Sequence, residues 1–293
     1  MSSESFESGM LSGRSRVAGI IGWPVTHSRS PRLHGFWLRR YGIDGAYVPL
    51  PVQPERFAEA LRALPLLGFA GANVTVPHKE AALASVDRAS REARHIGAVN
   101  TIVVAADGTL EGRNTDGFGF SENLRDALPG WSAVTGPAVL LGAGGAARAV
   151  AVALLDAGAP EVRLANRTAE RAERLAADIG GPIRVVGWDD RTAALADASM
   201  LVNTTTLGMA GQPPLDLPLD RLPPTAVVND IIYAPLETAL LAAARRRGNP
   251  VVDGLGMLLH QARPAFCAWF GVEPEVTPEL RRFVLQDPLG GPR

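Results

Sequence analysis

The chain has 293 residues and a formal net charge of −1, with 46% hydrophobic and 20% charged residues. These proportions are typical of a globular protein, and the length is comfortable for two domains. A charge this close to zero argues against nucleic acid as the main partner, because phosphate binding requires a basic surface. The single cysteine, Cys267, excludes an internal disulfide and fits a reducing cytoplasm.

Neither end of the chain has the pattern of a packed element. Residues 1–15 are rich in Ser, Gly and Glu and contain no apolar run, so we expect a flexible tail and not a secretory signal. The Gly- and Pro-rich end from Pro288 is also expected to fray. Along the chain, no apolar run approaches the roughly 18 residues that a membrane span requires.

Short apolar runs alternate with helical segments in the first third of the chain. Ser30 before Pro31 is typical of an N-cap followed by proline at the first helical position. Strands that alternate with helices predict a parallel sheet with right-handed crossovers. We expect strands at 17–22, 46–50 and 71–76, and helices at 31–41, at 54–64 and after Pro77.

Polar side chains gather where the first and third strands end. Ser28 and Ser30 follow the first strand, and Asn73, Thr75 and Lys79 accompany the end of the third. Because ligands of parallel sheets bind beyond the carboxyl ends of the strands, these side chains can face one crevice. Lys79 is the only lysine among 29 Lys and Arg residues. An ammonium is compact and its pKa can be shifted, whereas Arg keeps its proton, so this single use predicts a chemical role. The alternative is a surface lysine retained by chance.

The following segment is typical of a β-hairpin that leads into a helix. Its turn falls at Asp107-Gly108, and small polar residues on either side place Asn100 and Asp116 on loops. For Asp116, an Asx turn is the alternative interpretation. A helix is expected at about 120–128, and the Pro/Gly pairs within 128–137 indicate a domain boundary.

The second half opens with a dinucleotide-binding pattern. A strand at 138–141 precedes the loop Gly142-Ala143-Gly144-Gly145-Ala146-Ala147, and an apolar helix follows to about Asp156. This is a G-x-G-x-x-A fingerprint between a strand and a helix, where glycines allow backbone N–H groups to approach a pyrophosphate. The pattern alone is weak, and its setting makes it a good signal.

The next strand, at 161–165, should end in the residues that select the ribose. An NAD site places Asp or Glu there, but this strand ends in Asn166, Arg167 and Thr168, with Arg171 one turn further. Guanidinium groups bind phosphate bidentately, so we expect NADP in preference to NAD. A solvated helix arginine is the alternative for Arg171.

The remaining elements continue the alternation. The Arg245–Arg247 run closes an Ala/Leu helix before Gly248. An apolar helix from 254 to 269 contains His260 and Gln261, and we expect it to return to the first domain. Further strands are expected at 200–204, 227–233 and 251–253, with Tyr233 just past the tip of the second.

These residues together resemble the shikimate dehydrogenase family, over about residues 17–285. That family reduces 3-dehydroshikimate to shikimate with NADPH, in the shikimate pathway of aromatic amino acid and chorismate biosynthesis. Its fold is a two-domain α/β protein with the active site in the cleft between the domains. The matching stretches occur in family order and are highly specific together: His27–Pro31, Asn73–Lys79, Gly97–Thr101, Asn114–Gly117, Gly142–Ala146, Asn166–Thr168, Asn203–Met209 and Gly254–Gln261.

The resemblance implies a role for each matching position. Lys79 and Asp116 would be the catalytic pair, and Ser28 and Ser30 would bind the substrate carboxylate, with Tyr233 lining that end. The other implied substrate ligands are Asn73, Thr75, Asn100 and Gln261. The implied NADP-binding residues are Gly142, Ala143, Gly144, Gly145, Ala146, Asn166, Arg167, Thr168, Arg171, Ile231, Gly254 and Met257; no metal is implied.

The implied architecture is a mostly parallel α/β substrate domain and a Rossmann-type domain, with a C-terminal helix that returns to the first. We expect a substrate domain at 16–119 plus 257–285 and an NADP domain at 120–256. The expected partner is a small molecule, with no nucleic acid or membrane, in a cytoplasmic monomer or homodimer.

Two positions depart from the common family pattern. His78 stands where Phe is frequent, and Gly35 where Asn or Gln is usual. Neither position transfers a proton in the family. We expect His78 to titrate near neutrality and to obscure pH profiles, but it ranks below Lys79 as a proton donor. With Lys79 as the acid, we expect oxidation to gain rate well above neutral pH.

Three other functions fit parts of the sequence. A quinate or aminoshikimate dehydrogenase would use the same Lys79 and Asp116. A catalytically inactive nucleotide-sensing regulator should have lost one of these two residues. A different NADP enzyme, such as a folate dehydrogenase, does not need the serine and Asn73/Thr75 set, which suits a polyhydroxylated acid.

Overall fold

The structure is a computed structural model that describes residues 11–286. It divides into two compact units. Unit 1 contains the residues up to Arg94, then Ala98–Thr115, then those from Gln261 onward; unit 2 contains His95–Gly97 and Asp116–His260. The chain passes from one unit to the other between residues 115 and 116 and between residues 260 and 261. The domain boundaries expected from the sequence are 119/120 and 256/257.

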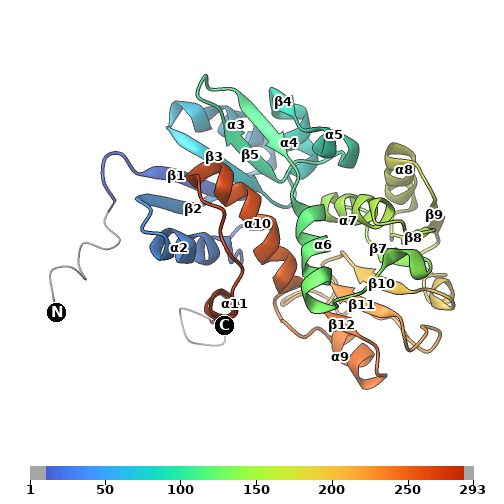
Figure 1. The fold of residues 1–293 in the computed structure, drawn as a ribbon. Coiled ribbons are helices and arrows are strands. Elements are labelled where there is room, and N and C mark those ends of the chain that lie inside the picture. Colours follow the sequence, from blue (N-terminus) through green and yellow to red (C-terminus); the bar gives the residue numbers. More distant parts are fainter. Residues whose placement is uncertain (1–10, 287–293) are drawn as a thin grey trace. The chain divides into compact units, whose positions relative to one another are not determined.

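Unit 1 is built on a six-stranded mixed sheet with the order β2-β1-β3-β5-β6-β4, which can be followed in Figure 1. β1 pairs in parallel with β2 and β3, and β4 pairs in parallel with β6. The β5–β6 hairpin is antiparallel and turns at Gly108, which has φ +83°, as the Asp107-Gly108 pair predicts. The strands are β1 (Arg16–Gly22), β2 (Gly45–Pro51), β3 (Phe69–Val74), β4 (Arg88–Ala89), β5 (Thr101–Val104) and β6 (Leu110–Arg113).

Helices pack against this sheet on both faces because its strands are apolar on both. Ala72 and Val74 of β3 belong to one core cluster, which also contains Phe57 and Leu61 of α3. On the opposite face the indole Nε1 of Trp269 in α10 donates a 2.9 Å hydrogen bond to Ile102 O. The helices are α2 (Ser30–Arg40), η1 (Pro54–Arg56), α3 (Phe57–Leu66), α4 (Lys79–Ser85), α5 (Arg91–Ile96), α10 (Gly254–Phe270) and α11 (Pro278–Leu285).

Unit 2 has a parallel six-stranded sheet with the order β12-β11-β10-β7-β8-β9. Taken in chain order, this is the 3-2-1-4-5-6 arrangement of a Rossmann fold, and the strand order reverses between β7 and β10. The strands are β7 (Ala138–Leu141), β8 (Val162–Ala165), β9 (Ile183–Val186), β10 (Met200–Asn203), β11 (Val227–Asp230) and β12 (Val251–Val252). The helices are α6 (Asp116–Ala127), η2 (Ala133–Thr135), α7 (Gly145–Asp156), α8 (Ala169–Ile179), η3 (Ala193–Leu195) and α9 (Ala239–Arg246).

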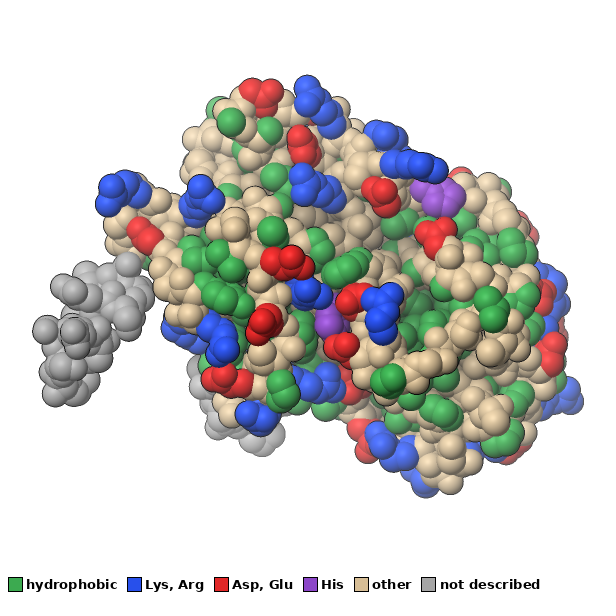
Figure 2. Space-filling view, in the orientation of Figure 1, with side chains coloured by type: hydrophobic (Ala, Val, Ile, Leu, Met, Phe, Trp, Pro, Cys, Tyr) green, Lys and Arg blue, Asp and Glu red, His purple; other side chains and the backbone are tan. Residues whose placement is uncertain are grey.

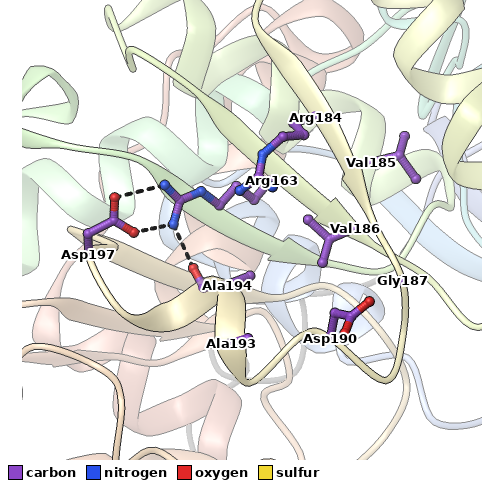
Figure 3. Close-up of a pocket in the computed structure, with 9 residues that line it drawn as sticks. All are labelled: Arg163, Arg184, Val185, Val186, Gly187, Asp190, Ala193, Ala194 and Asp197. Atoms are coloured by element: carbon purple, nitrogen blue, oxygen red, sulfur yellow. Dashed lines mark hydrogen bonds and ion pairs between the residues drawn. The ribbon is translucent and has the colours of Figure 1, made fainter.

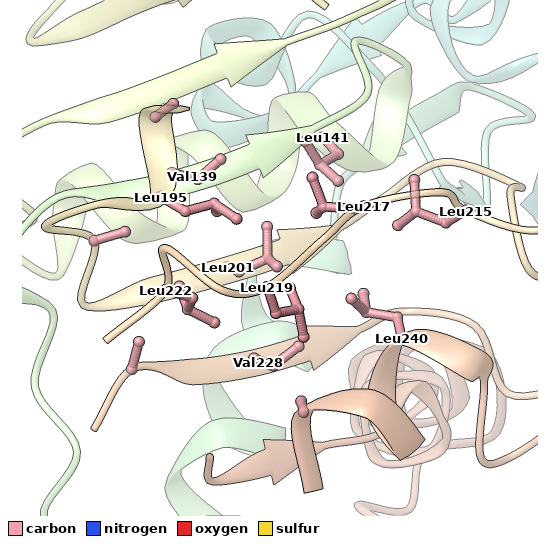
Figure 4. Close-up of a cluster of buried hydrophobic side chains, with 14 of the residues drawn as sticks. Val139, Leu141, Leu195, Leu201, Leu215, Leu217, Leu219, Leu222, Val228 and Leu240 are labelled. Atoms are coloured by element: carbon pink, nitrogen blue, oxygen red, sulfur yellow. The ribbon is translucent and has the colours of Figure 1, made fainter. Parts of the chain in front are cut away.

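The connection from β10 to β11 covers the sheet with an extended segment and not with a helix. Leu215, Leu217 and Leu219 alternate along it, and all three join the core cluster that contains Leu201 and Val228 of the strands they cover. Figure 4 shows these leucines pointing into the cluster. Alternation buries one side of an extended chain, so this segment replaces a crossover helix without losing apolar contact.

Flexible tails were predicted at both ends of the chain. Residues 1–10 and 287–293, where the flexible and frayed ends were expected, lie outside the described residues. The part of the first tail next to β1 is anchored, because the Ser12 and Ser15 hydroxyls both donate to the carboxylate of Asp44.

Arginine and acidic side chains are interspersed over the face drawn in Figure 2. Among residues 11–286, no helix has the length and hydropathy of a transmembrane segment.

Candidate active site

The glycine loop of unit 2 lies at the point where the strand order reverses. Gly142 follows β7 with φ +106°, and a Cβ there would lie 2.7 Å from Thr204 Oγ1 at the end of β10. The Thr204 hydroxyl donates a 2.6 Å hydrogen bond to Leu141 O, which joins the ends of the two strands. Only glycine permits this approach together with a positive φ.

The start of α7 is open toward a ligand. Gly144 is the N-cap residue and Gly145 begins the helix, and nothing within 4 Å would meet a Cβ on Gly144. Neither residue of this first turn offers a side-chain cap, so the backbone N–H groups at the helix N-terminus can bind an anion. The loop therefore fits the pyrophosphate of a dinucleotide.

The tip of β8 carries the residues expected to select the ribose. Asn166 Nδ2 donates to Thr168 O at 2.8 Å, and Arg171 N donates to the same carbonyl at 3.2 Å as α8 begins. Arg167 and Arg171 are both exposed. Arg167 in this loop and Arg171 in the first turn of α8 are two guanidinium groups, and residues 166–168 contain no carboxylate. This composition suits a phosphate better than a ribose diol.

A buried carboxylate orders the ends of β10 and β11. Asp230 has no exposed surface, and its Oδ1 accepts 3.1 Å hydrogen bonds from Asn203 Nδ2 and Ile232 N. Thr238 donates to Oδ2 at 2.7 Å, and burial raises the pKa of Asp230 to about 6. The carboxylate thus fixes both ends of the loop that contains Ile231 and the half-buried Tyr233. Asp230 has no predicted role. The signal that could have marked it is a charged residue at the end of an apolar strand.

The other predicted unit 2 residues begin helices. Asp116 was expected on a loop, but it is the first residue of α6 and is 1% exposed. The helix begins earlier than expected because Gly117 packs closely on α7, where a Cβ would lie 3.3 Å from Ala149 O. Gly254 begins α10 against the backbone of Ile231, and Met257 is buried one turn later.

In unit 1, the predicted serines occupy the start of α2. Ser30 was expected to cap this helix, but it is the first helical residue; Arg29 occupies the N-cap position, and its side chain makes no capping hydrogen bond. Ser30 N instead donates to Ser28 Oγ at 3.3 Å. Arg29 reaches the last turn of α11, donating to Val284 O at 2.8 Å and to Leu285 O at 3.0 Å. The two serines are thus held at the helix N-terminus, a favourable place for a carboxylate.

Asn73 and Asn100 lie in one hydrogen-bonded network. Asn73 faces Thr101 across the β3–β5 pair, and its Nδ2 donates to Asn100 O and to Thr101 Oγ1, each at 3.2 Å. Asn100, which is 2% exposed, accepts from Thr115 N at 2.9 Å and from Thr101 Oγ1 at 3.0 Å. Tyr47 completes the network by donating to Asn73 Oδ1 at 2.7 Å. Tyr47, Thr101 and Thr115 have no role among the predictions from the sequence.

Lys79 is the first residue of α4 and is half-buried. Its carbonyl oxygen accepts a 2.9 Å hydrogen bond from Val99 N, so the start of α4 is fixed to the residue before Asn100. Thr75 lies in the turn that precedes the helix, and its N donates to Ile21 O at 2.9 Å. Gln261, the remaining predicted ligand of unit 1, is half-buried on α10.

His78 does not have the exposed environment that would let it obscure pH profiles. Its ring is 2% exposed, stacks on Phe57 with centroids 4.6 Å apart, and places Nε2 2.8 Å from Val52 O. Burial lowers the pKa of His78 below its ordinary value. The ring is therefore neutral at pH 7, in agreement with its low rank as a proton donor.

A hollow of about 450 Å³ in unit 2 contains none of the predicted residues. It lies between β8, β9 and η3 (Figure 3), and its buried arginine, Arg163, is already bound by Asp197, Glu161 and Ala194 O. No cluster of three or more potential metal ligands occurs within residues 11–286.

The strand order and glycine loop of unit 2 define a dinucleotide-binding α/β protein. Family models match both units: the shikimate dehydrogenase substrate binding domain matches residues 20–102, and the shikimate/quinate 5-dehydrogenase domain matches residues 131–208. The chain belongs to the shikimate dehydrogenase family.

Individual relatives agree with this membership. The shikimate dehydrogenase (NADP(+)) of Paramagnetospirillum magneticum is 65% identical over 94% of this chain and 100% of its own. The crystal structure of the Thermus thermophilus shikimate 5-dehydrogenase with NADP(H) and shikimate is 39% identical, has a TM-score of 0.81, and covers 92% of this chain and 98% of its own. A Corynebacterium glutamicum quinate dehydrogenase with NAD is 33% identical, with a TM-score of 0.85 over 92% and 99% of the two chains.

Proposed function

We propose that this chain is an NADP-dependent shikimate dehydrogenase that reduces 3-dehydroshikimate to shikimate. The observation that carries the proposal is the setting of its single lysine. Lys79 begins α4, and its carbonyl is hydrogen-bonded to the backbone immediately before Asn100, whose side chain belongs to the network around Asn73. We place the ammonium of Lys79 beside these amides and hydroxyls, where a compact cation suits a polyhydroxylated substrate with a carbonyl to protonate.

The proposed chemistry divides between cofactor and chain. NADPH supplies the hydride when it is bound. Lys79 donates a proton to the carbonyl oxygen, a contribution of roughly 10²–10⁴-fold for a positioned acid, and its charge stabilises the developing alkoxide. Asp116 is the proposed carboxylate partner of Lys79. Because these residues belong to different units, their pairing is part of the proposal and not a distance that the fold fixes.

The remaining predicted residues bind and orient the substrate. Ser28 and Ser30 are the proposed donors to its carboxylate, which the N-terminus of α2 also favours. Tyr233 lines the same end, and the loop that carries it is ordered by Asp230. The ring hydroxyls are assigned to Asn73, Thr75, Asn100 and Gln261.

For NADP, the proposal uses the open glycine loop and the arginines after β8. The loop from Gly142 to Ala146 takes the pyrophosphate at the start of α7. Arg167 and Arg171, with Asn166 and Thr168, take the 2′-phosphate. Ile231, Gly254 and Met257 complete the proposed cofactor contacts.

The functional boundaries remain those that the sequence indicates. Residues 16–119 and 257–285 form the proposed substrate domain, and residues 120–256 form the proposed NADP domain. A cytoplasmic location is also proposed, supported by the single cysteine. A monomer and a homodimer both fit this function.

Steady-state rates of the purified chain with shikimate or quinate, each with NADP or NAD, test this function. We expect the highest kcat/KM for shikimate with NADP. The quinate dehydrogenase among the solved relatives makes quinate with NAD the second candidate. A higher kcat/KM for that pair would replace shikimate by quinate in the proposal. A thermal shift with each ligand gives an independent measure, because specific ligands raise the apparent stability.

A further inference from the structure

We propose that Tyr47 is a positioning residue that holds the Asn73 side-chain amide in the orientation set by Asn100 O, so that Asn73 can only accept a hydrogen bond from the substrate. This inference rests on the proposed function, in which Asn73 contacts a ring hydroxyl. Tyr47 lies on β2, two strands from Asn73 in the order of the unit 1 sheet.

The contacts of Asn73 account for nearly all its hydrogen-bonding capacity. An asparagine side chain has two N–H donors and two acceptor lone pairs. Both donors of Asn73 are directed to protein oxygens, Asn100 O and Thr101 Oγ1, each at 3.2 Å. The Tyr47 hydroxyl occupies one lone pair of Oδ1 at 2.7 Å. What remains for a ligand is the second lone pair of that oxygen.

The opposite amide orientation is disfavoured by its neighbours. A flipped Asn73 would place its oxygen against Asn100 O, which is a carbonyl and can only accept. The Thr101 hydroxyl could not relieve this conflict, because it donates to Asn100 Oδ1 at 3.0 Å. Asn100 O therefore selects the orientation, because the Tyr47 hydroxyl could also accept from a flipped amide. Tyr47 holds the selected orientation by donating to Oδ1.

Tyr47 is itself held in a rigid aromatic environment. Its ring is 8% exposed and stacks on the imidazole of His34, with centroids 4.0 Å apart and planes inclined by 4°. The ring of Trp269 packs beside the Tyr47 ring, with centroids 6.0 Å apart. Burial lowers the pKa of His34 to about 3, so the imidazole is neutral at working pH. Burial also raises the pKa of Tyr47 well above 10, so the phenol keeps the proton that it donates to Asn73.

A fixed acceptor gives the site a chemical preference. A substrate hydroxyl can donate to Asn73 Oδ1, whereas a carbonyl, an ether oxygen or a fluorine at the same place cannot. The hydroxyl concerned is one that does not react, since the reacting oxygen is a carbonyl in the substrate. Tyr47 thus contributes to the selection of a polyol without touching it.

Tyr47→Phe tests the role because it removes only the phenol oxygen. We expect KM for shikimate to rise about tenfold, because the half-buried Asn73 Oδ1 loses its protein donor and the amide is held less firmly. The KM for NADP should stay within twofold, and kcat should fall less than threefold. Tyr41→Phe is the matched control, because the Tyr41 hydroxyl accepts from Glu275 N at 3.1 Å in the same unit and touches none of the predicted ligands. It should leave both KM values unchanged.

A double-mutant cycle separates positioning from general packing. If Tyr47 acts through Asn73, adding Tyr47→Phe to Asn73→Ala should change KM for shikimate less than twofold. An additive effect of the two changes, or an unchanged KM in Tyr47→Phe, would overturn the role of Tyr47. As a second readout, the wild type should discriminate shikimate from a fluorine-for-hydroxyl analogue at the affected ring position more strongly than Tyr47→Phe does. A wild-type chain that neither binds nor oxidises shikimate would instead contradict the proposed function.

Discussion

The Thr238 hydroxyl donates a 2.7 Å hydrogen bond to Oδ2 of Asp230, a carboxylate with no exposed surface. Thr238 is also the N-cap of α9, accepting from Leu241 N at 3.3 Å. Asn203 and Ile232 bind the other carboxylate oxygen, so one side chain connects two strand ends and a helix start. Burial disfavours the charged carboxylate, whereas the three donors favour it, and burial is the larger effect.

Asp230 should make stability depend on pH in an unusual direction. Its folded pKa of about 6 lies above the ordinary value of 3.8, because burial disfavours the charged form. Between about pH 4 and 6 the unfolded chain loses this proton first, so the free energy of unfolding falls as pH rises. The contribution is fully present below about pH 4 and is lost above pH 6, and it amounts to about 3 kcal/mol.

Asp230→Asn should remove that pH dependence. Urea unfolding at pH 4.5 and 7 measures the difference between variant and wild type, which cancels the effects of the other carboxylates. We expect the variant to gain stability relative to the wild type at pH 7. Asp189→Asn is the control, since Asp189 is exposed in the same unit. An identical pH response in wild type and Asp230→Asn would show that Asp230 is ionised normally.

Arg163 should matter to stability far more than a surface arginine. It is 7% exposed and donates to Ala194 O at 2.8 Å and to Asp197 Oδ2 at 2.9 Å. Arg163→Ala removes a buried stem and leaves Ala194 O without this donor, a cost of about 2–3 kcal/mol. Arg125→Ala breaks the exposed pair with Glu122 and should cost about 0.5 kcal/mol or less. Chemical denaturation of both variants gives the comparison, and equal costs would contradict it.

His78→Phe should leave the pH–rate profile unchanged between pH 7 and 8. The imidazole is buried, and burial lowers its pKa below the ordinary value, so it stays neutral in this range. The variant loses the contact with Val52 O, and its unfolding free energy should fall by about 1 kcal/mol. A shifted profile would give His78 a part in proton transfer.

Arg167→Ala should weaken NADPH binding selectively. A charge-assisted contact to the 2′-phosphate predicts a rise in KM for NADPH of about tenfold or more, with less than a twofold change for NADH. Arg174→Ala is the matched control, because Arg174 is another exposed arginine of α8. If Arg167→Ala changed both cofactors equally, the 2′-phosphate would be bound elsewhere.

Sequence patterns predicted the elements whose signals are local. The strand at 138–141 and its glycine loop are confirmed, because strand, glycine turn and helix start are adjacent in the chain. The extended segment from Leu215 to Leu219 was not predicted. Its alternating leucines pack on the sheet, but the segment is not itself a strand of that sheet. β9 was also missed, because it is a strand of only four residues at the edge of the sheet.

The residues predicted as ligands carry clearer local signals in the sequence than the residues that support them. The ligand residues have unusual local patterns, such as a lone lysine or a glycine loop. Tyr47 contacts Asn73, 26 positions away, and Asp230 contacts Asn203, 27 positions away. Such distant contacts are not visible in a local pattern, and for Asp230 the only local signal is a charge at the end of an apolar strand. The structure differs from the expectation in the same way at Ser30 and Asp116, because both helices begin before the expected residue.

Lys79→Arg is the most direct test of the proposed function. The substitution keeps the positive charge and replaces the compact, titratable ammonium by a guanidinium that holds its proton. Single-turnover and steady-state rates should be measured on protein whose melting temperature matches that of the wild type. We predict that kcat falls about 100-fold while KM for shikimate stays within threefold. A variant that keeps more than about a tenth of the wild-type kcat with normal KM would show that Lys79 is not the proton donor.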